Sequence, residues 1–203
     1  MKYELIREKR KTISIRVEPN GQIVVKAPIK APIAFIEQFI LSKQSWISKQ
    51  LKRIESVNTF KNSFDFSSYF YILGQKCNFA EVDMALIGAT QNQIWKHYNK
   101  MAAELLPDMA GKKVEETGLE YRTLKISNSR RVWGSFDRNG NMKLNYKLVI
   151  LPPELVNYVI VHELCHGKYL NHSKQFWTKV GDFCPEYKKL KKQLEMYSFL
   201  LEI

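Results

Sequence analysis

Residues 159–173 read VIVHELCHGKYLNHS, and this stretch carries the pattern H-E-x-x-H at His162, Glu163 and His166. In a helix of 3.6 residues per turn, two histidines four positions apart lie one turn apart on the same face. Their ring nitrogens can therefore converge on one metal ion. Glu163 lies about 100° around the helix from His162, close enough to reach a water molecule on that ion without displacing it. The spacing predicts a helix that carries a site for metal-activated hydrolysis.

The residues around this motif predict that the helix is buried on most sides. Apolar residues surround it nearly completely, which is typical of a core helix. Two imidazoles and a carboxylate left unpaired in such a place would cost on the order of several kcal/mol, and a bound cation would satisfy all three. The apolar residues are Leu155, Val156, Val159, Ile160, Val161, Leu164 and Cys165.

A third imidazole lies six residues after His166, at His172. Three protein ligands, with a fourth position left to water, is the arrangement of catalytic zinc. The sequence therefore predicts one zinc ion per chain, held by His162, His166 and His172. Glu186 competes for the third place, because some H-E-x-x-H enzymes take a glutamate from a later helix. Glu186 also has an alternative structural role: directly after Pro185, its negative charge can stabilise the N-terminus of a helix.

The other candidate metal ligands have structural interpretations. Cys165 points about 100° away from His166 on the helix, so we interpret it as a small core residue. It is widely separated from Cys77 and Cys184, and no C-x-x-C pair is present, which argues against a cysteine zinc cluster or a disulfide framework. His97, on a different predicted helix, is interpreted as a surface or packing residue.

Strand and helix patterns both occur along the chain, which predicts an α+β fold. We expect an N-terminal subdomain over residues 1–85, built from a β-hairpin and helices, and a catalytic subdomain over residues 86–203. A break or kink is expected near Pro107. The predicted strands are residues 12–17, 22–27, 122–127, 131–136 and 141–146. The predicted helices cover residues 31–54 and 91–117 and begin near Pro152, after Ser173 and at Pro185.

The composition predicts a basic, soluble protein. Among 203 residues, 32 Lys and Arg stand against 20 Asp and Glu, a net charge of +12. No apolar run is long enough to span a bilayer and the first residues lack a signal-peptide pattern, so we expect a cytoplasmic protein without a membrane partner. Positive charge favours acidic partners such as nucleic acid, although no recognised nucleic-acid-binding motif organises the basic residues.

Several short motifs together resemble the YgjP-like family of metal-dependent hydrolases, which are zincin-type metallopeptidases and distantly SprT-like. The resemblance extends over nearly the whole chain. It departs from the family at Val132 and Phe136, where the family usually has Arg and Cys; here Arg131 stands one place earlier. The matching motifs are Trp133-Gly134-Ser135, Leu144-Asn145-Tyr146, Pro152-Pro153-Glu154, His162–His166, Asn171-His172-Ser173 and Phe176-Trp177.

The resemblance implies a zincin-like catalytic subdomain with a small antiparallel sheet and an active-site helix. The strand carrying Trp-Gly-Ser would then line the substrate site or simply pack beside the helix. Its candidate lining residues are Arg131, Trp133, Gly134 and Ser135, with Arg131 also a candidate oxyanion donor.

The sequence thus predicts a zinc metallopeptidase in which Glu163 takes a proton from the metal-activated water and passes it to the leaving amine. A peptide or protein substrate is expected, with an extended backbone pairing to an edge strand. Three alternatives stay open. One is a nucleic-acid-associated binding protein, the second is a protease for DNA-linked proteins, by analogy with the SprT-like relatives, and the third is a hydrolase of small amides.

Overall fold

The computed structural model describes residues 1–203, which form two compact units, Met1–Ser63 and Phe64–Ile203. The division lies earlier than the boundary after residue 85 that the sequence predicts. The reason is a hairpin at the start of the second unit, whose Leu73 backbone amide donates to the carbonyl oxygen of Val149 at 2.7 Å. Hydrogen bonds between backbone groups of distant segments cannot be predicted from the pattern of side chains. None of the helices combines the length and the apolar composition that crossing a bilayer requires.

The N-terminal unit is a three-stranded sheet covered by two helices. The predicted hairpin is present as β2 and β3, which pair antiparallel, and its turn places Gly21 at a φ of 82°. The sheet also contains β1, which lies parallel to β3 in the order β1-β3-β2. Its core joins apolar side chains of β3 to Ile36, Ile40 and Ile47 of the helices. The elements are β1 (Glu4–Glu8), β2 (Ser14–Val17), β3 (Ile23–Pro28), α1 (Ile33–Ser42) and α2 (Gln44–Lys61).

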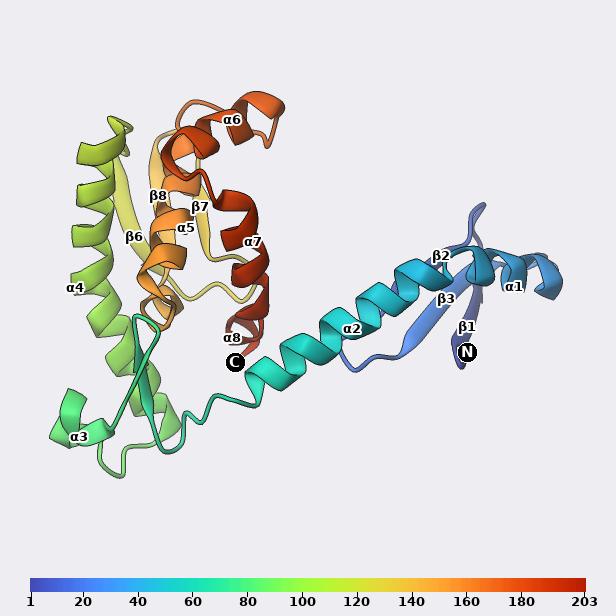
Figure 1. The fold of residues 1–203 in the computed structure, drawn as a ribbon, viewed down its shortest axis with the longest axis horizontal. Helices are drawn as coiled ribbons and strands as arrows, with labels where there is room; N and C mark the ends of the chain where they lie inside the picture. Colours follow the sequence, from blue (N-terminus) through green and yellow to red (C-terminus); the bar gives the residue numbers. More distant parts are fainter. The chain divides into compact units, whose positions relative to one another are not determined.

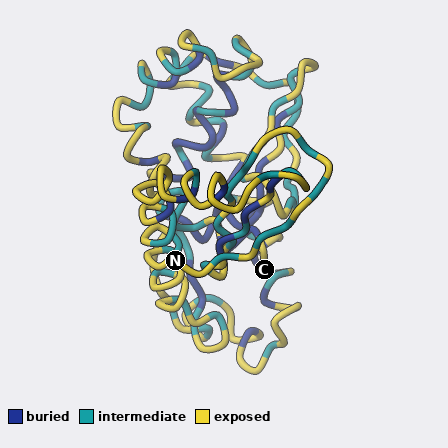
Figure 2. Tube along the Cα trace, turned by 90° about the vertical axis from the view of Figure 1, so that its right-hand side faces the viewer, coloured by how far each residue is buried: buried dark blue, intermediate teal, exposed yellow.

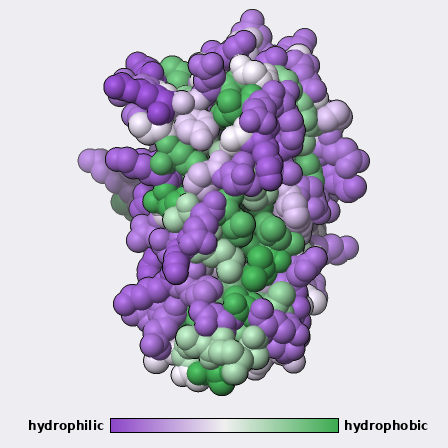
Figure 3. Space-filling view, turned by 90° about the vertical axis from the view of Figure 1, so that its left-hand side faces the viewer, coloured by the Kyte–Doolittle hydropathy of each residue, from purple (hydrophilic) through white to green (hydrophobic).

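The second unit is built around the predicted motif helix, α5, which contacts β7, β8, α4, α6 and α7 (Figure 1). Nine of its 13 residues are buried, so the prediction from its apolar surroundings is confirmed. Buried stretches of the trace gather in the interior, whereas exposed stretches lie on outer turns and loops (Figure 2). Seen from the side of α4, hydrophilic residues cover most of the surface, with patches of hydrophobic residues between them (Figure 3).

The elements of this unit confirm the α+β class. They are β4 (Phe70–Ile72), β5 (Gln75–Cys77), α3 (Phe79–Val82), η1 (Met84–Leu86), α4 (Gln91–Thr117), β6 (Thr123–Ser127), β7 (Gly134–Phe136), β8 (Asn141–Asn145), η2 (Tyr146–Ile150), α5 (Pro153–Cys165), α6 (Lys174–Phe183), α7 (Tyr187–Met196) and α8 (Phe199–Glu202).

The three-stranded sheet of the second unit is mixed and not purely antiparallel as predicted. Its order is β6-β8-β7, so the β7–β8 hairpin pairs antiparallel while β6 lies parallel to β8 on the other side. Alternation of side chains predicts strands but does not distinguish these two pairings. The order leaves β7 at an edge of the sheet.

The long helix α4 continues through Pro107, where the sequence predicts a break or kink, so the helix is not broken there. A capping box between Thr90 and Gln93 begins the helix, and Gly118, in the left-handed conformation at a φ of 63°, ends it. The helix packs on η2 and α5, and this tertiary support outweighs the hydrogen bond lost at proline.

Candidate metal centre

Two of the three predicted ligands lie at the end of α5. His162 is in its last turn and His166 is the C-cap residue, so the two imidazoles are one turn apart on the same face. The chain then turns at Gly167, whose backbone amide donates to the carbonyl oxygen of Leu164 at 3.0 Å. Ser173 caps α6 by accepting a hydrogen bond from a backbone amide. The connection between these two ends brings His172 back to the helix.

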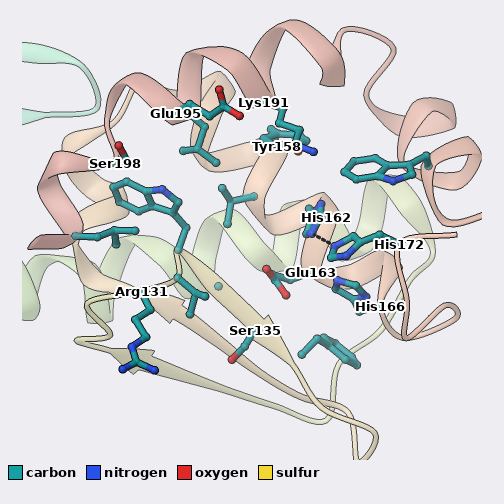
Figure 4. A pocket seen from close by; sticks show the side chains of 18 of the residues that line it. Arg131, Ser135, Tyr158, His162, Glu163, His166, His172, Lys191, Glu195 and Ser198 are labelled. Atoms are coloured by element: carbon teal, nitrogen blue, oxygen red, sulfur yellow. Dashed lines mark hydrogen bonds between the residues drawn. The ribbon is translucent and has the colours of Figure 1, made fainter. Parts of the chain in front are cut away.

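The three imidazoles converge on one point. Ring nitrogens of His162, His166 and His172 all lie within 4.8 Å of one another. The Nε2 atoms of His162 and His172 are 3.0 Å apart, and Figure 4 shows these two rings facing each other. Zinc bound tetrahedrally with Zn–N bonds of roughly 2.0–2.1 Å places its nitrogen ligands about 3.3 Å apart. The residues present therefore fit a zinc ion.

The protonation of the rings suits metal binding. His166 Nδ1 lies 2.9 Å from the carbonyl oxygen of Tyr169, and because a carbonyl only accepts, Nδ1 carries the proton and Nε2 keeps its lone pair. Burial, with smaller contributions from His166 and His172, lowers the pKa of His162 to about 3. Partial shielding of its ring from water, with smaller contributions from His166 and Lys191, also lowers the pKa of His172. Neutral imidazoles are the form that coordinates metal.

Aromatic rings of α6 and α7 pack against the imidazoles. The indole of Trp177 stacks on His172 with ring centres 5.5 Å apart, and Tyr187 stacks on Trp177 at 5.2 Å. Phe176 stacks on His166 at 4.5 Å. These contacts orient His172, which is itself exposed, and they explain why Phe-Trp follows the third histidine so closely.

Glu163 is buried against the backbone of β7. Only 6% of its surface is exposed, and burial raises the pKa of its carboxyl to about 8. A Cβ atom built on Gly134 would lie 2.6 Å from Cγ and 2.7 Å from Oε1 of Glu163. Only a residue without a side chain at position 134 leaves room for this carboxylate. Glycine is therefore required at position 134 because a side chain there would overlap Glu163. Its backbone conformation does not require glycine, since its φ is not in the left-handed region.

A cavity of about 860 Å³ lies in front of the imidazoles, with β7 along one side and α7 along another. Arg131, Trp133, Gly134 and Ser135 all border it, as the sequence predicts for candidate lining residues. Their orientations differ, because the side chain of Arg131 points away from the histidines (Figure 4). The geometry gives no support to Arg131 as an oxyanion donor.

Several residues that line the cavity were not predicted from the sequence. Tyr158 lies one turn before His162 on α5, and helical spacing could have identified it. Burial raises the pKa of Tyr158 to about 12, so it stays a neutral hydrogen-bond donor. Lys191 and Glu195 come from α7, which no local pattern connects to the motif.

Asn145 positions the chain that leads into β7. Its side-chain amide donates to the carbonyl oxygens of Ser129 and Val132 at 2.7 and 3.2 Å, and its backbone amide donates to the carbonyl oxygen of Trp133 at 2.8 Å. Its side-chain oxygen accepts from the backbone amide of Lys147. Because Asn145 is fully buried and makes all these bonds, it connects β8 and η2 to the strand beside Glu163.

The competing ligands lie elsewhere. Glu186 precedes α7 with 69% of its side chain exposed and an ion pair to Lys189, and it is not among the converging ligands. Cys165 is buried within α5, and burial raises the pKa of its thiol to about 11. His97 contacts the ring of Phe70 and lies 3.8 Å from Asp83, remote from the cluster in sequence and contacts.

The chain matches a known protein family over most of its length. A family model described as "YgjP-like, metallopeptidase domain" matches residues 11–197. No curated protein matches the chain. Among solved structures, the metallopeptidase zymogen abylysin of Pyrococcus abyssi is similar, with 22% sequence identity and a TM-score of 0.41; the match covers 44% of this chain and 91% of that chain.

Proposed function

Because the chain belongs to the YgjP-like metallopeptidase family, we propose that it is a zinc-dependent peptidase whose ligands are His162, His166 and His172. The observation that carries this proposal is the convergence of three imidazoles beside the buried side chain of Glu163. A purely structural metal site would need no such carboxylate, and structural zinc is usually closed by a fourth protein ligand.

Zinc in such a site would lower the pKa of a water molecule towards about 7 and polarise the carbonyl group under attack. Glu163 is the general base in this proposal. A cation bound by the three imidazoles would favour the ionised form of this buried carboxyl group, and that form accepts the proton of the attacking water and delivers it to the leaving amine. The backbone of β7 at Gly134 holds this carboxylate in place. Burial of Glu163 limits the contact of its carboxyl group with bulk solvent.

The sheet supports a peptide as substrate. Since β7 lies at the edge of the order β6-β8-β7, its outer backbone groups have no strand partner. An extended peptide can pair with such an edge, which would align its scissile bond with the adjacent Glu163. A small amide would use none of these backbone groups, so the edge strand favours a peptide or protein substrate.

Metal analysis tests the ligand assignment. Protein purified without chelators is expected to contain about one zinc per chain, because three imidazoles at this spacing suit a catalytic zinc site. The measurement is elemental analysis before and after dialysis against a chelator, followed by titration with zinc. Binding far below one equivalent, with no gain on titration, would contradict the assignment.

Gly134→Ala tests the contact between β7 and the general base. The added methyl group would overlap atoms of the Glu163 side chain, which is flexible, so we expect the protein to fold and bind zinc with the carboxylate displaced. A misplacement of about 1 Å costs on the order of 10²-fold in rate, so kcat should fall by about that factor.

The matched control for this substitution is Gly111→Ala. A Cβ atom at Gly111, within α4, meets nothing within 4 Å, so the control should keep its activity and gain about 0.5–1 kcal/mol of stability. Equal kcat values for the two variants and the parent would show that Gly134 does not position Glu163.

A further inference from the structure

The N-terminal unit holds two thirds of the net charge of the chain. Residues 1–63 contain thirteen Lys and Arg against five Glu and no Asp, a net charge of +8 out of +12. None of the residues assigned to the metal centre belongs to this unit. Its charge is therefore not part of the proposed metal centre, and such an excess of basic residues favours binding of a polyanion.

Aromatic side chains are exposed where α1 meets α2. Phe35 and Trp46 have 58% and 43% of their surfaces exposed. Phe39, one turn after Phe35, borders a shallow hollow together with Trp46, Lys43 and Ile15. The ammonium group of Lys43 lies 5.9 Å from the centre of the Phe39 ring. Phe35 and Trp46 thus present aromatic rings to solvent, and the hollow beside Trp46 is also bordered by the cation of Lys43.

The basic residues continue along α2 from this hollow. Trp46, Lys49 and Arg53 recur at intervals of three and four residues, within an arc of about 60°. All three are exposed, whereas Ile47 is buried in the core of the unit. We call the surface formed by Phe35, Phe39, Lys43, Trp46, Lys49 and Arg53 the aromatic–basic face.

This face suits a chain with flat rings and regularly spaced negative charges. Bases stack on aromatic side chains while phosphates contact lysine and arginine, and both contacts are available to a single strand. A membrane surface fits less well, since an interfacial helix gathers its apolar residues on one side. On α1, the exposed Phe35 and Leu41 point about 120° apart.

We propose that the aromatic–basic face of the N-terminal unit binds single-stranded nucleic acid. Trp46 stacks on a base, and Lys49 and Arg53 contact successive phosphates. This interaction is independent of the metal centre, so the peptidase assignment can fail without affecting it.

The test measures binding of the full-length, zinc-loaded protein to a fluorescent oligo(dT) of about 16 nucleotides across a range of salt concentrations. Trp46→Leu keeps an apolar side chain but removes the stacking surface, so affinity should fall about tenfold with an unchanged salt dependence. Lys49→Gln combined with Arg53→Gln should reduce the slope of log K against log salt by about 1.4, because two phosphate contacts are lost.

The matched charge control is Lys188→Gln combined with Lys192→Gln, two exposed lysines four residues apart on α7. This control should leave both affinity and slope unchanged. The proposal is overturned if the control weakens binding as much as the α2 variants, or if neither α2 variant changes binding. It is also overturned if the protein binds phosphatidylserine vesicles through Trp46 but does not bind the oligonucleotide.

Discussion

Glu163→Gln is expected to leave the zinc content at the parental level while lowering kcat by about 10²–10⁴-fold, the usual contribution of a general base. Glutamine keeps the shape of the buried side chain but cannot accept the proton of the attacking water. The carboxylate lies beside the three imidazoles without belonging to the group of converging ligands. Zinc analysis and steady-state kinetics on one preparation measure both effects.

Thermal unfolding adds a second measurement to this variant. Burial favours the neutral form of Glu163, so a neutral glutamine should make the protein no less stable than the parent. The control is Glu154→Gln, the same change at an exposed position in the first turn of α5, which should keep full activity. Activity of Glu163→Gln near the parental value would remove Glu163 as the base.

His172→Ala is expected to weaken zinc binding by more than about 100-fold, beyond the usual effect of losing an outer-shell contact. In the proposed site His172 is one of three ligands, and its Nε2 lies 3.0 Å from that of His162. Glu186→Ala should leave affinity within about tenfold, because Glu186 is exposed and paired with Lys189. Competition against a chromophoric chelator measures both dissociation constants.

The reverse result would identify a different class of site. If Glu186→Ala lost the metal and His172→Ala retained it, the third ligand would come from the later helix. The same measurements distinguish a ligand from a residue that only orients it. Substitution of Trp177, which stacks on His172, should change metal affinity less than substitution of His172.

Features that depend only on neighbouring residues, such as the motif helix and the first hairpin, can be predicted from the sequence. The four-residue spacing of His162 and His166 and the apolar surroundings are enough to predict a buried helix with two converging imidazoles. The Asn20-Gly21 turn likewise predicts the hairpin of the first unit, because its dihedral requirements are local. Two features predict His172 as the third ligand: its short separation from the helix and the family resemblance.

Contacts between distant segments could not be predicted in this way. Nothing near Gly134 indicates that Glu163 will lie against its backbone, since the two meet only when β7 packs on α5. The parallel pairing of β6 with β8 depends on strand order, which side-chain alternation does not encode. The continuation of α4 through Pro107 depends on packing that outweighs local preference.

Cleavage of an unfolded protein substrate tests the central claim most directly. Zinc-loaded protein should cleave reduced, denatured casein, lose this activity in the presence of a chelator, and regain it when zinc is restored. Glu163→Gln protein treated in parallel should stay inactive while carrying its zinc. Cleavage that persists after complete removal of the metal, or that survives in Glu163→Gln, would contradict the assignment of a zinc peptidase with Glu163 as its base.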